Sequence, residues 1–270
     1  MTTGVPHPGS AARGSAAATT QVAIVVVTYE AESTIEELLG RIPDACESVR
    51  PRVLIADDCS SDRTVALARA WADAAPLDVE VVVRDRNLGY GGNQKASFAS
   101  AADEGADVVV LLHGDAQYPP ERIGDLLAPI LSGEADFVFG SRMIDRGGAR
   151  AGRMPLKKRI GNRVLSRLLN SMTDASLTEW FSGFRAYRTS SLLDAGLAAM
   201  PDGFDFDVAV TVALLDRGAR VQEIAIPTRY AGEISRVPLV RTGLQVLRHG
   251  VAASRRRVPE LAVSSPRPTS

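Results

Sequence analysis

Five short polar segments in the first half of the chain each follow directly on an apolar run. They are T-Y-E-A-E (28–32), A-D-D-C-S-S-D (56–62), R-N-L-G-Y-G-G-N-Q-K (86–95), H-G-D-A-Q-Y-P-P-E (113–121) and G-S-R (140–142). Carboxylates such as Asp57 and Asp58 can accept hydrogen bonds from a base or from ribose hydroxyls. Glycines 89, 91 and 92 let the backbone approach a ligand closely. The five segments together predict one composite binding site.

The fourth segment carries the sharpest chemistry. Asp115 follows the apolar pair Leu111-Leu112 and precedes Gln117 by two residues. A carboxylate and an amide oxygen are ligands that suit Mg²⁺ or Mn²⁺, and diphosphate oxygens would complete the shell. The metal would act as a Lewis acid on a departing nucleoside diphosphate. The alternative is an aspartate in a turn before the helix that Pro119-Pro120 begins.

The elements that must position these segments alternate along the chain. Strands are predicted at Val22–Thr28, Arg52–Ala56, Val79–Arg84, Val108–Leu112 and Phe137–Gly140, with helices at Ser33–Arg41, Asp62–Ala74, Gly92–Glu104 and Glu121–Leu131. Strands that are apolar on both faces and alternate with helices indicate a parallel sheet between helical layers. Ligands bind beyond the carboxyl ends of such strands, which is where the polar segments lie.

Each segment also has a purely structural interpretation. Asp58, Ser60 or Ser61 could cap the following helix. The G-Y-G-G turn differs from the G-x-G-x-x-G dinucleotide pattern, and it follows the third strand instead of the first. Capping does not readily explain five such segments at successive strand ends.

Composition and charge exclude several classes of protein. No apolar stretch reaches the length of a membrane span, two cysteines exclude a disulfide scaffold, and three scattered histidines offer no zinc spacing. The formal net charge of −1 hides an asymmetry, because residues 1–140 carry 10 basic and 21 acidic side chains and residues 141–270 carry 21 and 11. Such asymmetry suggests two tasks in one chain.

After residue 140 the pattern changes. An exposed loop is expected at Ser141–Arg153, then a basic amphipathic helix at Leu156–Met172, a helix at Phe206–Arg217, a strand at Val221–Ile226 and a last helix near Leu239–Ala253. The basic side chains of the first of these helices are Lys157, Lys158, Arg159, Arg163 and Arg167. They could attract anionic lipids, although a solvated helix face explains them equally well.

The ordered set of motifs resembles the family 2 glycosyltransferases of GT-A fold, in particular the branch of dolichyl- and polyprenyl-phosphate sugar synthases. The resemblance covers roughly residues 22–237 and includes S-G-F-R-A-Y (182–187) and G-E-I-S-R (232–236). It implies a Rossmann-like, mostly parallel sheet flanked by helices, with an acceptor-side extension. Composition predicts a disordered tail at 1–20 and a disordered basic tail at 255–270. Between them the chain divides into a nucleotide-sugar-binding half (21–140), an acceptor half (141–237) and a helix (238–254).

Site residues follow from the same resemblance. The nucleotide sugar would be bound by Thr28, Tyr29, Glu32, Asp57, Asp58, Asn87, Gly89, Lys95 and His113. Asp115 and Gln117 would hold Mg²⁺ or Mn²⁺. Arg142, Arg185 and Arg236 would bind donor diphosphate or acceptor phosphate, and Asp115, Asp205, Asp207 and Arg142 would be the catalytic set.

Three positions depart from the family pattern. His113 stands where the branch has the first aspartate of its aspartate-x-aspartate motif, and could ligate the ion, contact ribose or do neither. Arg236 replaces a lysine. Ala209 replaces the glutamate that usually serves as base, with Asp205 and Asp207 nearby but offset. A phosphate acceptor is already ionised and needs no base, so the missing glutamate favours such an acceptor.

The sequence therefore predicts an inverting, metal-dependent glycosyltransferase in cell-envelope or glycan biosynthesis. Its donor is a nucleoside diphosphate sugar and its favoured acceptor is polyprenyl phosphate, reached by a cytoplasmic protein at the inner membrane face. A transferase for a soluble saccharide or secondary metabolite is the close alternative. A non-catalytic nucleotide-sugar-binding protein stays open, whereas a sugar nucleotidyltransferase is disfavoured because no phosphate loop follows the first strand. No nucleic-acid partner is expected.

Overall fold

The computed structural model is described for residues 20–46, 49–145, 154–227 and 239–257. Its strands are β1 (Val22–Thr28), β2 (Arg52–Asp57), β3 (Asp78–Val83), β4 (Val108–His113), β5 (Phe137–Ser141), β6 (Arg185–Arg188) and β7 (Val221–Ala225). Its helices are α1 (Ile35–Gly40), α2 (Ile42–Ala45), α3 (Thr64–Ala74), α4 (Tyr90–Asp103), α5 (Ile123–Leu131), α7 (Leu156–Thr173), α8 (Thr189–Asp194), α9 (Phe206–Asp216) and α10 (Leu239–Arg257), with short 3₁₀ turns at Pro120–Arg122 and Leu197–Ala199.

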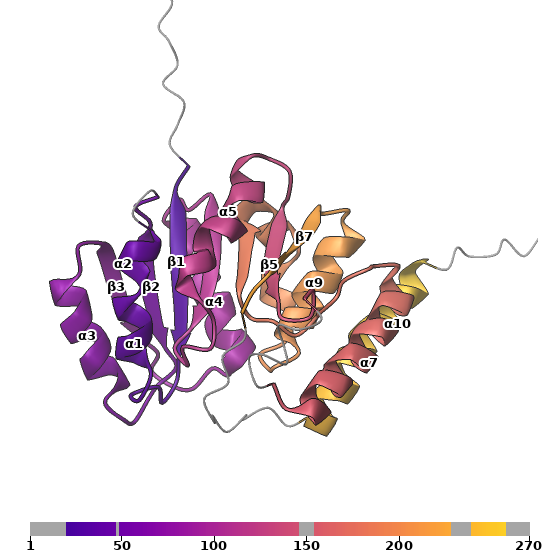
Figure 1. Ribbon diagram of the computed structural model, residues 1–270, viewed down its shortest axis with the longest axis horizontal. Helices are drawn as coiled ribbons and strands as arrows, with labels where there is room; N and C mark the ends of the chain where they lie inside the picture. The colour runs from indigo at the N-terminus through magenta and orange to yellow at the C-terminus, as the bar shows by residue number, and fades with distance from the viewer. Residues whose placement is uncertain (1–19, 47–48, 146–153, 228–238, 258–270) are drawn as a thin grey trace, which may run out of the picture.

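Across the described residues the strands form one seven-stranded sheet in the order β3-β2-β1-β4-β6-β5-β7 (Figure 1). β6 runs antiparallel to β4 and β5, and the other pairs are parallel. The predicted mostly parallel sheet is confirmed. The antiparallel strand was not predicted, because residues 180–188 carry no clear alternation of apolar and polar side chains.

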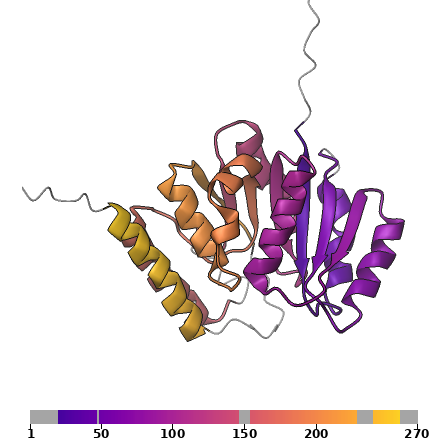
Figure 2. The same ribbon diagram turned by 180° about the vertical axis from the view of Figure 1, so that it is seen from behind.

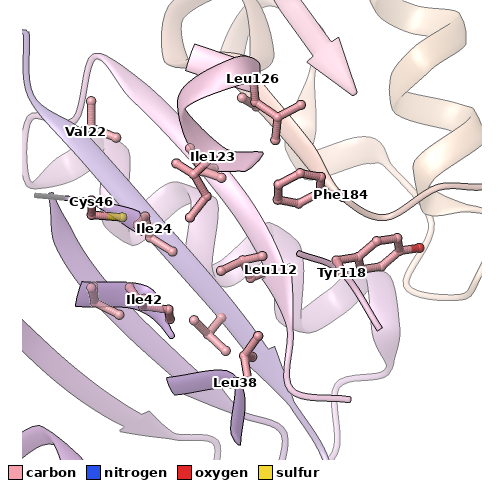
Figure 3. Close-up of a cluster of buried hydrophobic side chains, with 14 of the residues drawn as sticks. Val22, Ile24, Leu38, Ile42, Cys46, Leu112, Tyr118, Ile123, Leu126 and Phe184 are labelled. Atoms are coloured by element: carbon pink, nitrogen blue, oxygen red, sulfur yellow. The ribbon is translucent and has the colours of Figure 1, made fainter. Parts of the chain in front are cut away.

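The central strands are apolar on both faces because both faces are covered. Val22, Ile24 and Val26 of β1 point into one cluster with α1, α2 and α5, which Figure 3 shows. Ala23 and Val25 point into the opposite cluster. This burial on both sides explains why the extents of β1, β2 and β4 were predicted to within a residue.

Helices α4 and α9 cover the second face of the sheet (Figure 2). A third cluster joins α7, α9 and α10 around Leu169, Trp180, Val208 and Val246. Gly250 lets α7 and α10 pack closely, because a Cβ there would lie 2.7 Å from the sulfur of Met172. The two helices therefore form an outer layer at the side of the sheet away from β3 (Figure 1).

Some boundaries differ from the sequence prediction. The expected exposed loop begins with Ser141, Arg142 and Met143, which are buried, and its residues 146–153 lie outside the described part. α10 extends to Arg257, beyond the expected end of the last helix. Most of the two expected tails, 1–19 and 258–270, also lies outside the description. In the part of the chain described, no helix combines the length and the apolar character that crossing a membrane requires.

Near β5 and β7, Asp136 forms ion pairs with two arginines, Arg220 and Arg188. Both carboxylate oxygens of Asp136 accept hydrogen bonds from the guanidinium of Arg220, at 2.7 Å (Oδ1 to Nη2) and 3.0 Å (Oδ2 to Nε). This pairing lowers the pKa of Asp136 to about 2. A carboxylate with a depressed pKa stabilises the fold above its unfolded value of about 4 and loses that contribution as the pH falls towards 2.

We therefore expect Asp136→Asn to lower the free energy of unfolding at pH 7 by about 1 kcal/mol, because Arg220 is half exposed and solvent screens the pair. The difference from the natural protein should shrink between about pH 4 and pH 2. Urea unfolding at several pH values measures it. Asp78→Asn, at an exposed carboxylate 3.8 Å from Arg52, is the control and should change little. A difference at pH 2 as large as the difference at pH 7 would contradict the pairing.

Candidate active site

The carboxyl ends of three parallel strands meet at one edge of the sheet. Thr28 pairs with Asp57, and Val27 pairs with His113. The Thr28 hydroxyl is buried and has no hydrogen-bond partner among the described residues, whereas Tyr29 beside it is 41% exposed. The structure thus brings the segments after β1, β2 and β4 together, as expected.

The two aspartates at the end of β2, Asp57 and Asp58, are buried. Asp57 accepts hydrogen bonds from the backbone N–H and hydroxyl of Ser60, at 2.8 and 2.6 Å. Asp58 accepts the N–H groups of Leu88 and Gly89, at 2.7 and 3.0 Å. Burial raises the pKa of Asp58, and these two hydrogen bonds oppose the rise. Both carboxylates thus fix loops at the strand edge, and binding of base or ribose by them stays a prediction.

Nearby predicted residues hold the same loops. Glu32 is exposed, and its carboxylate accepts the backbone N–H of Arg63 just before α3, at 3.0 Å. The side-chain oxygen of Asn87 accepts the N–H of Gly89, at 3.0 Å. These contacts order the loops between the strands and leave ligand binding by Glu32 and Asn87 untested.

The glycines at the start of α4 pack against another part of the chain, residues 201–202. A Cβ on Gly91 would lie 2.4 Å from the carbonyl oxygen of Pro201, and a Cβ on Gly89 (φ +82°) would lie 2.8 Å from that of Asp202. The N–H groups of Gly91 and Gly92 donate to the Asp202 carbonyl, at 2.8 and 3.3 Å. We expected these glycines to admit a ligand, and the structure instead fills the space with the Pro201–Asp202 backbone.

Lys95 belongs to the same junction. Its ammonium lies 2.6 Å from a carboxylate oxygen of Asp202 and 2.7 Å from the carbonyl oxygen of Met200. Lys95, which was predicted to bind the nucleotide, therefore joins the segment before α9 to α4. This places the first turn of α9 next to the strand edge.

A polar cluster lies where α4, β4 and α9 converge. The Tyr90 hydroxyl donates to Asp207 Oδ2 at 2.7 Å and lies 3.4 Å from Nε2 of His113. The Tyr118 ring stands edge-on to His113, with ring centroids 5.4 Å apart. The second oxygen of Asp207 is buried without a hydrogen bond, 3.8 Å from Nε of Arg185. His113, Asp207 and two tyrosines thus form one unit.

His113 packs inside this cluster. A Cβ on Gly183 would lie 2.4 Å from its Nε2, so the glycine is what allows the imidazole to fit. Burial lowers the pKa of His113, against the opposing effects of Asp115 and Asp207. Among the three roles left open for His113, this geometry supports packing within the polar cluster.

Asp115 and Gln117 lie at the rim of the cluster, and both are partly exposed. Asp115 Oδ1 accepts the N–H of Gln117 at 3.1 Å, which closes a tight turn through Ala116 with its positive φ of 54°. In the described parts of the chain, no three His, Cys, Asp or Glu side chains are grouped to hold a metal ion. Asp115 and Gln117 could therefore bind a metal only if the ligand supplied further oxygens.

Arg185 is inside the protein, only 1% exposed. Its guanidinium donates to the carbonyl oxygens of Trp180, Ser182 and Asp207 and to the hydroxyl of Thr211, at 2.6 to 3.1 Å. We expected Arg185 to bind a phosphate. The structure uses its donors to join the segment before β6 to α9.

Arg142 is also buried. Its Nε donates to Glu179 at 2.9 Å, Nη2 pairs with the same carboxylate, and Nη2 also donates to the Phe181 carbonyl. Asn162 of α7 donates to Glu179 as well, at 3.1 Å. The expectation of direct phosphate contact is therefore not met by this arrangement, and Arg236 lies outside the described residues.

Asp205 links the site to the outer helices. Its Oδ2 lies 2.9 Å from Nε2 of His249 on α10, while Oδ1 is buried without a hydrogen bond. Asp205 and Asp207, the two candidates for the missing base, are thus both buried and both engaged. Ala209, at the position of the usual glutamate, is buried one turn further along α9.

Comparison with known proteins decides the family. The family model "Glycosyl transferase family 2" matches residues 23–195. The chain belongs to glycosyltransferase family 2. It is 28% identical to polyprenol monophosphomannose synthase of Mycolicibacterium smegmatis over 77% of each chain. It is 30% identical to undecaprenyl-phosphate mannosyltransferase of Micrococcus luteus, over 76% of this chain and 82% of that one.

The fold of this glycosyltransferase is the GT-A fold. Glucosyl-3-phosphoglycerate synthase of Mycobacterium tuberculosis, solved with Mn²⁺, UDP and phosphoglyceric acid, superposes with a TM-score of 0.66. The match covers 87% of this chain and 78% of that one at 18% identity.

Three residues of the glycosyltransferase site were not predicted. Tyr90, Tyr118 and Gly183 lie within the predicted motifs, whose neighbouring glycines, acids and arginines were the predicted site residues. A signal existed for the tyrosines, because a polar-tipped ring inside a motif at a strand end usually finds a buried hydrogen-bond partner.

The glycosyltransferase should tolerate no side chain at position 91. We expect Gly91→Ala to lower the free energy of unfolding by about 1–3 kcal/mol without any ligand, because the new methyl overlaps the Pro201 carbonyl. Thermal unfolding measures the loss. Gly124→Ala in α5, where a Cβ meets nothing within 4 Å, is the control. Unchanged stability with only a raised donor KM would mean that Gly91 serves a ligand after all.

Proposed function

We propose that this glycosyltransferase moves a sugar, with inversion, from a nucleoside diphosphate sugar to polyprenyl phosphate at the cytoplasmic face of the membrane. The observation that carries the proposal is the agreement among relatives. The two mannosyltransferases named above and the dolichol-phosphate mannosyltransferase of Pyrococcus furiosus, 27% identical, all take their names from isoprenoid lipid acceptors.

The chemistry of α9 supports a phosphate acceptor. A hydroxyl acceptor needs a carboxylate that removes its proton, and Ala209 cannot do so. Asp207 is 6% exposed, and its Oδ2 accepts the hydrogen bond from Tyr90. A phosphate monoester is ionised at neutral pH and attacks the anomeric carbon without a base.

Two side chains at the rim of the site suit a divalent metal. Asp115 and Gln117 supply a carboxylate and an amide oxygen, which suit Mg²⁺ or Mn²⁺. Since two such ligands do not complete the coordination shell, oxygens of the donor diphosphate and water would supply the rest. When bound, the metal offsets the charge of the leaving nucleoside diphosphate.

The protein's own residues then divide into two groups. Tyr29 is 41% exposed just after β1, where the nucleotide would bind, and Thr28 precedes it with a buried hydroxyl. Asp58 holds the loop beside them through Leu88 and Gly89. Arg142 acts indirectly, because its pairing with Glu179 fixes the chain just after β5.

An acceptor assay tests this proposal. Purified protein with Mn²⁺ is offered a panel of nucleoside diphosphate sugars together with undecaprenyl phosphate, undecanol or 3-phosphoglycerate. We expect transfer to undecaprenyl phosphate, because it alone combines the ionised nucleophile with an isoprenoid chain. Transfer only to 3-phosphoglycerate would contradict the lipid acceptor, and nucleotide binding without any turnover would contradict catalysis.

The metal proposal predicts that Asp115→Ala lowers turnover on the order of 100-fold or more, because several kcal/mol of charge stabilisation are lost. The same variant should lose Mn²⁺ binding in the presence of nucleoside diphosphate, measured by electron paramagnetic resonance. Asp103→Ala, at an exposed carboxylate near the end of α4, is the matched control. Full Mn²⁺ binding by the Asp115 variant would refute the assignment.

A further inference from the structure

We propose that the outward face of α7 docks on an anionic lipid bilayer through a row of aliphatic side chains set among basic ones. The row consists of Leu156, Ile160, Val164 and Leu168, which are 58%, 54%, 49% and 41% exposed. Their spacing of four residues places them on one side of the helix. The role of this surface in the reaction rests on the proposed function. The docking itself is inferred from the exposed side chains of α7.

The basic side chains lie on the same side. Lys157, Arg163 and Arg167 are exposed. The helical repeat places all three among the four aliphatic residues. α7 contains five Lys and Arg residues and no acidic residue. A helix with Leu, Ile or Val beside Lys and Arg, and no acids, is the type that lies in a membrane interface.

The opposite side of α7 is firmly packed. Leu169 is fully buried, and Ser166 and Thr173 are each 2% exposed. The Asn162 side chain donates to Glu179, which also pairs with Arg142. The exposed row therefore belongs to a helix that is held in place. Single exposed leucines are common on soluble proteins, whereas an uninterrupted row over four turns marks an interaction site.

Charge identifies the occupant of this face. Two copies pairing through the same face would bring six exposed basic side chains together, three from each copy, and α7 has no acidic residue to neutralise them. An anionic lipid surface supplies both the apolar layer and the opposite charge. The neighbouring α10 continues this character, with Leu244 (60% exposed) and Val251 (39%) beside the exposed Arg248 and Arg255.

The position of the face suits the reaction. α7 begins at the end of the molecule where β1, β2 and β4 have their carboxyl ends, and runs beside α10 (Figures 1 and 2). Docking through α7 would bring that edge near the bilayer, where a lipid-linked phosphate has its head group. The apolar row would set the depth, and the lysine and arginines would select anionic lipid.

Vesicle flotation tests the docking surface. The full chain is mixed with vesicles of phosphatidylcholine alone, or with phosphatidylglycerol added, without donor or acceptor. We expect binding to the anionic vesicles that weakens as salt is raised. Ile160→Glu with Val164→Glu should weaken it about tenfold or more, since two aliphatic contacts are replaced by negative charge. Leu131→Glu, at a 47% exposed leucine on α5, is the matched control and should bind as the natural protein does.

A milder variant separates docking from folding. Arg163→Gln with Arg167→Gln keeps these positions polar but removes both charges, and it should weaken binding to anionic vesicles about fivefold per charge. Equal binding by all variants, or no vesicle binding by the natural protein, would overturn the proposal. So would a change from dimer to monomer in the glutamate variant without any change in vesicle binding. If the protein transfers sugar to undecaprenyl phosphate in detergent but does not bind vesicles, only the docking proposal is refuted. If it binds vesicles but transfers no sugar, only the proposed function is refuted.

Discussion

A buried guanidinium organises the site. Arg185 is removed from water in a sheet otherwise filled with aliphatic and aromatic side chains, and an unpaired charge there would cost several kcal/mol. It is satisfied by carbonyl groups before β6 and by Asp207 and Thr211 of α9, while it lies over the rings of Phe137 and Phe139. The antiparallel strand and α9 are thereby held together. Asp207 in turn accepts from Tyr90, which sets the position of His113.

Much of the conspicuous polar sequence therefore builds the site without facing a ligand. Asp57, Asp58 and Lys95 each bind backbone or side-chain groups of neighbouring loops. Such side chains fix the positions of residues such as Asp115 and Gln117, which are partly exposed at the rim. A site assembled from loops needs this support, because small displacements of the reacting groups cost catalysis heavily.

The sequence was sufficient for the parallel half of the sheet and insufficient for the details of the site. β1 and β4 are apolar on both faces, so their extent follows from local composition alone. The burial of Arg142 depends on Glu179, 37 residues away, and no local pattern announces that pair. Gly91 is necessary because Pro201 packs against it, a contact across about a hundred residues. Residue types at strand ends thus located the site, and tertiary packing decided which of them point inward.

The opposite charges of the two halves have a structural counterpart at the outer helices. The basic half contributes α7 and α10, and each is tied to the strand edge by a polar link, Asn162 to Glu179 and His249 to Asp205. Glu179 also holds Arg142 at the end of β5, and Asp205 precedes the turn that carries Asp207. A displacement of the outer helices, for example on contact with a bilayer, would therefore be transmitted to the site through Glu179 and Asp205. Because removing one partner of a buried ion pair is strongly destabilising, the Arg142–Glu179 pair, together with Asn162, keeps α7 joined to the end of β5.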